Sequence, residues 1–169
     1  MKHFRIILIG FIFVFLGACA SRGIMINTAP TEVKLSQYRS LWVSVLSEAA
    51  NEDEMRMLAD EVVRMLKSTN MFEQISGPGD SSTPLDLHLQ LNIVDIRRVS
   101  MQDRAFAGAI PGKAKLLVDG VLIDTATQQK IGGFRVEGKS SGGSVFAGDT
   151  GQAILRAAEI IVEYISRNH

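Results

Sequence analysis

Apolar and polar residues alternate along the middle of the chain, and this alternation is its clearest structural signal. From residue 85 to residue 93 every second residue is apolar. The intervening positions are polar: Asp86, His88, Gln90 and Asn92. A period of two places the two kinds of side chain on opposite faces of a strand. The pattern predicts a sheet with one face on the core and one in water. It slips at Val94, which predicts a β-bulge or the strand end.

Four more segments have strand character: residues 41–46, 71–75, 115–125 and 131–139. The first is apolar at nearly every position, so we expect it to be buried on both faces with Trp42 in the core. A short polar loop, residues 126–130, joins the last two segments. Short connections favour an antiparallel meander.

Two segments have the three- and four-residue apolar spacing of amphipathic helices: residues 51–67 and the stretch that begins at Asp149. Asn51 with Glu54, and Asp149 with Gln152, have the spacing of a helix N-cap and its capping-box partner. The order β-α-β-β-β-α predicts an α+β fold. We expect a two-layer sandwich, with a mixed or antiparallel five-stranded sheet and both helices on one face.

The N-terminus has the pattern of an export signal. Two basic residues in the first five are followed by an apolar run over residues 6–15, which is too short to span a bilayer. The run ends at Leu16-Gly17-Ala18-Cys19, which resembles a bacterial lipobox. Residues 1–18 are therefore predicted to be a signal peptide cleaved between Ala18 and Cys19.

Cys19 is the only cysteine of the chain, and a thiolate is a good acceptor for a diacylglyceryl group. Acyl chains such as palmitate anchor a protein stably when two or more are present. We expect membrane lipid to hold the protein through acylated Cys19. Residue 20 is Ala rather than Asp, which resembles the outer-membrane sorting of Gram-negative lipoproteins. The resemblance implies a periplasm-facing domain on the outer membrane.

Cleavage of residues 1–18 from the 169 leaves 151, enough for one domain with its own core. We interpret residues 19–37 as the lipidated cysteine and a tether, and residues 38–169 as a single domain. The alternative for Ile24 to Ile26 is a short added strand. Two of the 18 basic residues lie in the signal peptide. The mature chain therefore has 16 basic and 18 acidic residues, a net charge near −2. No basic field is present for nucleic acid.

The combination of lipobox, strand, helix and the segment Val-Asp-Gly-Val-Leu-Ile-Asp-x-x-Thr (118–127) resembles a bacterial lipoprotein family known as a domain of unknown function. The resemblance covers roughly residues 35–166. The topology is also similar to small periplasmic domains of envelope-assembly lipoproteins and of the Tol-system propeller protein. Such domains bind protein partners, so the resemblance implies protein binding and supplies no catalytic residue.

Residues 133–140 match the phosphate-loop pattern G-x-x-x-x-G-K-S. A phosphate loop needs a helix that opens at Lys-Ser, whereas residues 134–137 alternate like a strand and glycines follow Ser141. We therefore expect no nucleotide. Residues 105–113 and 140–148 form two loops rich in glycine and apolar residues. They are either plain connections or docking loops, with Phe106, Ile110 and Phe146 as the anchors.

The remaining polar residues give no catalytic or metal site. A Ser-His-Asp triad would have to use His88, and no His/Cys/carboxylate group has metal-ligand spacing. Asp119 reads as a half-buried polar contact and Asp124 as a turn-starting residue. Arg97 and Arg98, at a strand end, are either solvated charges or an anion site.

These observations predict a non-enzymatic, lipid-anchored envelope protein with no cofactor. Its domain would bind an envelope protein partner as an assembly or accessory module. An alternative is a binder of lipid or another apolar ligand between the sheet and the helices. A hydrolase that uses His88 and a subunit of a secretion pore are less favoured alternatives.

Overall fold

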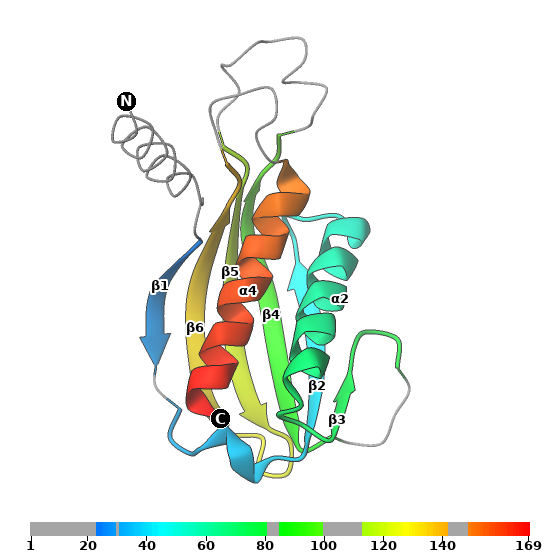
Figure 1. Cartoon of the computed structure of the whole chain (residues 1–169), viewed down its shortest axis with the longest axis vertical. Coiled ribbons are helices and arrows are strands. Elements are labelled where there is room, and N and C mark those ends of the chain that lie inside the picture. Colours follow the sequence, from blue (N-terminus) through cyan, green and yellow to red (C-terminus); the bar gives the residue numbers. More distant parts are fainter. Residues whose placement is uncertain (1–22, 30, 81–84, 100–112, 142–148) are drawn as a thin grey trace, which may run out of the picture.

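Two helices lie on one face of a six-stranded mixed sheet in the computed structural model, which describes residues 23–29, 31–80, 85–99, 113–141 and 149–169 (Figure 1). The elements are β1 (Ile24–Ala29), the 3-10 turn η2 (Leu35–Gln37), β2 (Ser40–Ser47), α2 (Glu52–Thr69), β3 (Gln74–Ser76), β4 (Leu87–Arg97), β5 (Lys115–Asp124), β6 (Lys130–Lys139) and α4 (Thr150–Asn168). The α+β class is as predicted. No helix in the described ranges is long and apolar enough to cross a bilayer.

The strands lie in the order β1-β6-β5-β4-β2-β3. Strands β4, β5 and β6 form the predicted antiparallel meander, whereas β2 runs parallel to both β3 and β4. The register of β4 against β5 shifts between Ile93 and Asp95, which confirms the predicted bulge at Val94. Helix α2 connects β2 to the neighbouring parallel strand β3, as a crossover must.

The predicted number of five strands is wrong because the chain before β2 adds a sixth. Strand β1 pairs antiparallel with β6, from Ile24 opposite Glu137 to Ala29 opposite Gly133. The strand alternative for Ile24 to Ile26 therefore holds, and residues 24–29 of the expected tether belong to the sheet. An edge strand with Asn27 and Thr28 lacks the alternation of a half-buried strand, which is why its pattern is weak.

Both predicted helix starts are confirmed. The side chain of Asn51 accepts a hydrogen bond from Glu54 N–H at 2.9 Å, and Glu54 accepts one from Asn51 N–H at 2.9 Å. Asp149 likewise accepts from Gln152 N–H at 3.1 Å. The helices begin where the side chains satisfy the otherwise unpaired N–H groups of the first turn.

The core lies between the helices and the sheet, and leucine and isoleucine fill it. The largest fully buried side chains are Leu35, Leu41, Leu58, Leu66, Leu87, Leu89, Leu91, Ile93, Leu116, Leu122, Ile154 and Ile161. Helix α4 approaches the backbone of β6 so closely that a Cβ built on Gly138 would lie 2.0 Å from the carbonyl oxygen of Ala153. The contact between β6 and α4 therefore depends on a residue without a side chain.

Candidate functional site: the open face of the sheet

The helices cover one face of the sheet, and the opposite face carries the residues of the other strand parity (Figure 1). We call this surface the open face. Its residues are Asn27, Trp42, Ser44, Leu46, His88, Gln90, Asn92, Leu117, Asp119, Val121, Ile123 and Arg135. They come from five strands, so the register of the sheet sets their spacing.

Trp42 lies on the open face, which corrects the prediction that it belongs to the core. Leu41 and Val43 are fully buried against the helices, and the alternation of β2 turns Trp42 to the other side, where it is 39% exposed. Leu46, on the same side, is 53% exposed. An apolar run predicts burial on both faces only when both faces are covered, and here one is not.

His88 and Trp42 lie side by side on the open face. Their rings stack with centroids 4.1 Å apart and planes 20° from parallel. The Oγ of Ser44 lies 2.7 Å from Nε2 of His88. Burial lowers the pKa of His88, so the neutral ring is favoured and can accept the serine hydroxyl proton. In the described part of the chain no carboxylate hydrogen-bonds this ring, so the third member of a triad is not in place.

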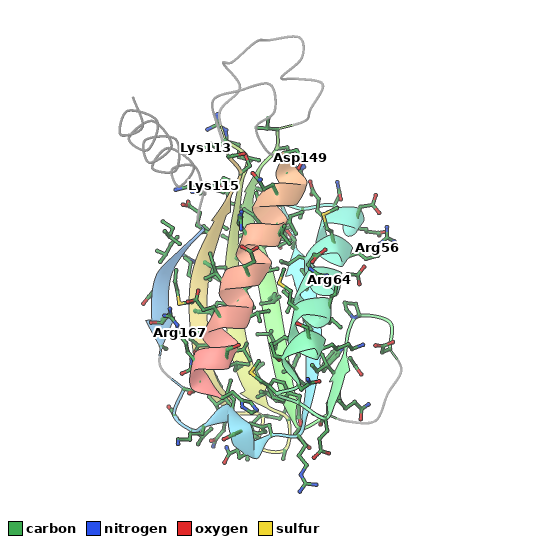
Figure 2. All side chains as sticks on the ribbon, viewed as in Figure 1. Arg56, Arg64, Lys113, Lys115, Asp149 and Arg167 are labelled. Atoms are coloured by element: carbon green, nitrogen blue, oxygen red, sulfur yellow. The ribbon has the colours of Figure 1, made fainter. Side chains whose placement is uncertain are left out.

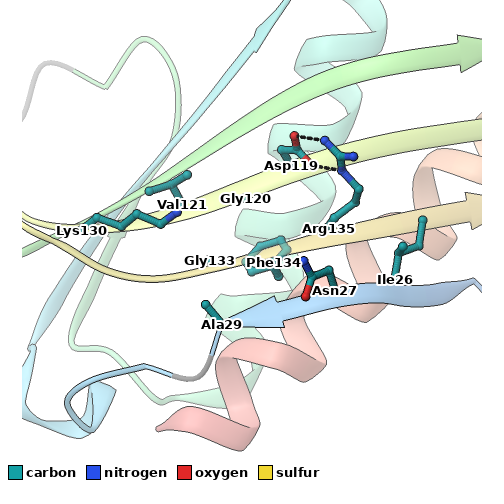
Figure 3. Close-up of a pocket in the computed structure, with 10 residues that line it drawn as sticks. All are labelled: Ile26, Asn27, Ala29, Asp119, Gly120, Val121, Lys130, Gly133, Phe134 and Arg135. Atoms are coloured by element: carbon teal, nitrogen blue, oxygen red, sulfur yellow. Dashed lines mark hydrogen bonds and ion pairs between the residues drawn. The ribbon is translucent and has the colours of Figure 1, made fainter.

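A shallow depression of about 480 Å³ lies where β1, β5 and β6 meet (Figure 3). Its lining consists of Ile26, Asn27, Ala29, Asp119, Gly120, Val121, Lys130, Gly133, Phe134 and Arg135. Gly133 has no side chain that could fill the hollow. A Cβ there would already lie 3.1 Å from Cε of Lys130. Beside it Arg135 donates two parallel hydrogen bonds to Asp119, from Nε to Oδ1 at 2.5 Å and from Nη2 to Oδ2 at 2.6 Å.

Two acidic groups are fixed in the ionised form on the open-face side of the sheet. The Arg135 guanidinium lowers the pKa of Asp119. Burial acts to raise the pKa of Glu137, but hydrogen bonds from Lys115 and Lys139 outweigh it, so that pKa is also lowered. The Glu137 side chain is only 7% exposed, with Lys115 Nζ 2.6 Å from its Oε2. The ion pairs of Asp119 and Glu137 therefore place fixed charges beside the apolar residues of the open face.

Acid should destabilise the domain through these groups. Arg98 lowers the pKa of Glu54 in the same way that Arg135 lowers that of Asp119. A carboxylate whose folded pKa is lowered stabilises the fold above its unfolded pKa, and this stabilisation is lost as pH falls through the folded value. We expect the free energy of unfolding to hold from neutral pH to about 5 and to fall between about pH 5 and 3. Urea titrations across this range measure it.

The control for this pH dependence is Asp119→Asn, which removes one of the titrating groups. Its free energy of unfolding should fall less steeply with acid than that of the unmodified protein. The difference is expected to stay below about 1 kcal/mol, because both side chains of the Asp119–Arg135 pair are partly exposed. A free energy of unfolding that stays constant down to about pH 3 would contradict the assignment.

Several predicted residues have structural roles. Arg98, one of two proposed anion ligands, donates to Glu54 at 2.7 Å and to the Ala49 carbonyl oxygen at 3.0 Å, so it joins the end of β4 to the start of α2. Arg97 is exposed. Asp124 begins the turn after β5, as predicted, with its Oδ1 accepting from Ala126 N–H and Thr127 N–H at 2.9 Å.

The phosphate-loop match lies mostly in strand β6, in agreement with the strand interpretation. Ala18, Cys19, Phe106, Ile110 and Phe146 lie outside the described residues. Within the described ranges, no three His, Cys, Asp or Glu side chains gather closely enough to hold a metal ion.

Sequence reasoning missed the cluster of Trp42, Ser44 and His88. The signal was present: His88 lies in the polar half of a clear alternation, and the same period in β2 places Trp42 and Ser44 together on one face. Only the parallel pairing of β2 with β4, which puts Trp42 opposite His88, could not be read from the pattern.

PelC and XCC0632, two solved bacterial proteins, share the fold with TM-scores above 0.5. A PelC dodecamer from Paraburkholderia phytofirmans is similar with a TM-score of 0.62 at 11% identity, over 85% of this chain and 96% of that one. Protein XCC0632 from Xanthomonas campestris, assigned to DUF330, gives 0.53 at 12% identity over 81% and 87%. Lipoprotein GNA1162 from Neisseria meningitidis gives 0.46 at 10% identity over 75% and 98%.

The sequence itself defines the family. The profile described as "Domain of unknown function (DUF4410)" matches residues 28–144, which is more than half of the chain. The protein therefore belongs to the DUF4410 family, and the resemblance to a domain-of-unknown-function family is confirmed. No curated protein matches the chain at a significant level.

Proposed function

We propose that this protein is a lipid-anchored lipoprotein of the cell envelope that acts as a non-catalytic protein-binding module, with the open face as its docking surface. In this proposal acylated Cys19 holds the protein on the periplasmic side of the outer membrane. The observation that carries the docking role is the exposure of Trp42 and Leu46 on a face that neither helix covers. Exposed aromatic and apolar groups rimmed by polar residues are typical of protein interfaces.

The charged pair beside the depression adds specificity to this surface. Asp119 on β5 and Arg135 on β6 lie in the same row of the sheet as Leu46, with β4 between Leu46 and Asp119, and they hold each other in a fixed geometry. A partner would bury Trp42 as its main contact, since tryptophan is enriched among the residues that dominate interface energies. Fixed charges at the rim favour one partner orientation over others.

The alternative of an apolar ligand between sheet and helices has less support. Large side chains of the core, among them Leu89, Leu91 and Ile161, are fully buried in that layer. At Gly138 the backbones of β6 and α4 are already in contact. A ligand could enter so closely packed a layer only by displacing core side chains, which costs stability.

Photo-crosslinking in intact envelopes tests the docking role. A photoreactive amino acid at Leu46 should capture a protein in stoichiometric yield. The matched control is Met57 on α2, which is 45% exposed but lies on a helix rather than on the open face. Trp42→Ala should weaken capture at Leu46 roughly 30-fold, the loss typical of a central interface residue. Equal capture from Met57, or none from Leu46, would contradict the proposal.

Self-assembly is a second candidate, favoured by one observation: the similar PelC structure is described as a dodecamer. The two edges of this sheet differ from each other. In the described residues, each edge has backbone groups that can pair with another strand. Strand β1 forms one edge, and β3 pairs with β2 only over Ser40 to Trp42, so the rest of β2 forms the other. Contacts between unlike edges build rings or filaments. Native mass spectrometry of detergent-extracted protein should then give one defined multiple of the acylated chain, and a monomer would exclude it.

A further inference from the structure

Strand β2 keeps a free backbone edge beyond the end of the short strand β3. The two strands pair only from Ser40 opposite Gln74 to Trp42 opposite Ser76. In the described ranges, residues 43–47 of β2 therefore have no strand next to them on that side. Figure 1 shows β3 beside the lower part of β2 only. We call the space beside residues 43–47 the vacant column, because it continues the line of β3.

The residues that follow β3 turn the chain out of this column. Asp80 N–H donates to the carbonyl oxygen of Gly77 at 3.3 Å, and the Asp80 carboxylate accepts from Gly77 N–H at 3.1 Å. Gly79 has a φ of +90°, which favours glycine in such a turn. Pro78 has no N–H to donate to a ladder. The local sequence therefore ends β3 at Ser76 and does not let it continue along β2.

The backbone of Val45 directs its hydrogen-bonding groups into the vacant column. The carbonyl oxygen of Arg39 accepts from Gln74 N–H at 3.3 Å, so this residue faces β3. Alternate residues of a parallel strand bond to the same neighbour, which places Val45 on the side of β3 and both Ser44 and Leu46 on the side of β4. Among the described residues, none hydrogen-bonds to Val45 from the side of the column. One N–H and one carbonyl oxygen are thus open to an added strand.

Residues 43–47 carry none of the devices that usually block pairing at a sheet edge. Their sequence is Val-Ser-Val-Leu-Ser, without a charge or a proline. The register of β2 on β4 advances one residue at a time from Leu41 to Ser47, so no bulge bends the strand. The opposite edge differs, because the register of β1 on β6 is interrupted between Met25 and Asn27. A flat, uncharged edge is a template for an extended segment of another chain.

Helix α2 bounds the vacant column on the side of the core. Cγ2 of Val63 lies 3.4 Å from where a Cβ on Gly77 would be, so this helix reaches the end of β3. Figure 2 shows Arg56 and Arg64 on the flank of α2 that faces away from α4, which is the side of β3. Each arginine pairs with an acidic residue one turn earlier on α2, Asp53 and Glu61 respectively. Both guanidinium groups are therefore already occupied.

We propose that the protein partner adds an extended segment to the edge of β2 in the vacant column. Its backbone bonds to Val45, and its alternate side chains, which are apolar, lie beside Trp42 and Leu46 on the open face. The inference rests on the proposed docking role of the open face and specifies how the partner is held. In this mode main-chain hydrogen bonds supply affinity and the alternate side chains supply specificity. A second copy of this chain is a poorer occupant, because its own free edge, β1, has an interrupted register.

Amide hydrogen exchange of the full-length protein tests whether the edge is free. The N–H of Val45 should exchange about tenfold faster, or more, than the N–H groups of Ser44 and Leu46, which face β4. Exchange at Val45 as slow as that at Ser44 would show that the chain itself already covers the edge. That result overturns the strand addition and leaves the docking role of the open face standing.

Photo-crosslinking in intact envelopes tests the register. A photoreactive phenylalanine derivative replaces Trp42 in one variant and Leu46 in another; both positions lie on the open face of β2. The two captured residues should lie about four positions apart in one partner segment, because paired strands advance together. Capture from separate segments overturns the strand addition but not the docking role, whereas no capture from Leu46 overturns the docking role as well. Capture of a second copy of this chain overturns the occupant proposed here.

A proline at the free edge tests the backbone contact. Val45→Pro removes the N–H that faces the vacant column and should lower capture at Leu46 about tenfold. The matched control is Ile26→Pro, since Ile26 is an exposed residue of the other edge strand and has no partner in the register of β1 on β6. It should leave capture unchanged.

Urea unfolding establishes that the proline variants fold. If Val45→Pro does not fold, Val45→Lys serves in its place, because a lysine on an edge strand opposes the addition of another strand. Unchanged capture in a folded Val45 variant, or an equal loss in Ile26→Pro, would overturn the strand addition.

Discussion

Gly138→Ala is expected to lower the free energy of unfolding by about 3 kcal/mol, which would be among the largest effects of adding a single methyl group to this domain. The added Cβ would lie 2.0 Å from the Ala153 carbonyl oxygen and 2.8 Å from the Ala157 backbone nitrogen. Both atoms belong to the backbone of α4, so no change of side-chain rotamer relieves the clash. The helix must move away from β6, and that movement opens gaps in the core around it.

Urea denaturation of the two proteins measures this effect. The control is Gly77→Ala, because there the nearest atom to the new Cβ is Cγ2 of Val63 at 3.4 Å, an ordinary van der Waals distance. Its free energy of unfolding should change by less than about 0.5 kcal/mol. If Gly138→Ala proves as stable as Gly77→Ala, the close packing of α4 on β6 is wrong.

The second large effect concerns the buried carboxylate of Glu137. Lys115→Met with Lys139→Met should cost about 2–4 kcal/mol, because it leaves a charge that is 7% exposed without its two partners. Both lysines are themselves more than a third exposed, so solvent limits the loss to this range. Addition of Glu137→Met in the same chain should recover most of the lost stability, since well-packed apolar groups replace a buried ion group at little cost.

Thermal and urea unfolding of the double and triple variants separate charge burial from lost packing. Recovery in the triple variant identifies the unpaired charge as the cause. If the triple variant is as unstable as the double variant, the lysine side chains act through their apolar stems instead. The control is Lys130→Met, which removes a lysine from an exposed position.

The local elements were predictable because their signals are local. Asn51 and Glu54 lie three residues apart and form the expected reciprocal caps, and the alternation of β4 identified both its buried face and its bulge. The turn role of Asp124 needed only the residues that follow it. Each of these features depends on side chains within a few positions of one another.

Features that depend on distant parts of the chain were missed. Trp42 was placed in the core because the apolar run of β2 carries no information about whether a second layer covers its other face. The contact of Ser44 with His88 requires β2 to insert between β3 and β4, an order that sequence spacing does not encode. Strand β1 gains its backbone partners from β6, so its own polar composition gave little indication of a strand.

The pairing of β1 with β6 also constrains the order in which the sheet is completed during folding. Strand β1 must wait for β6, which lies about 100 residues further along the chain, and Tyr164 of α4 then donates to the carbonyl oxygen of Ala29 at 2.8 Å. Contacts between distant segments form slowly. The sheet edge formed by β1 is thus completed late, and until that moment the uncovered edge of β6 is open to pairing with a strand of another chain.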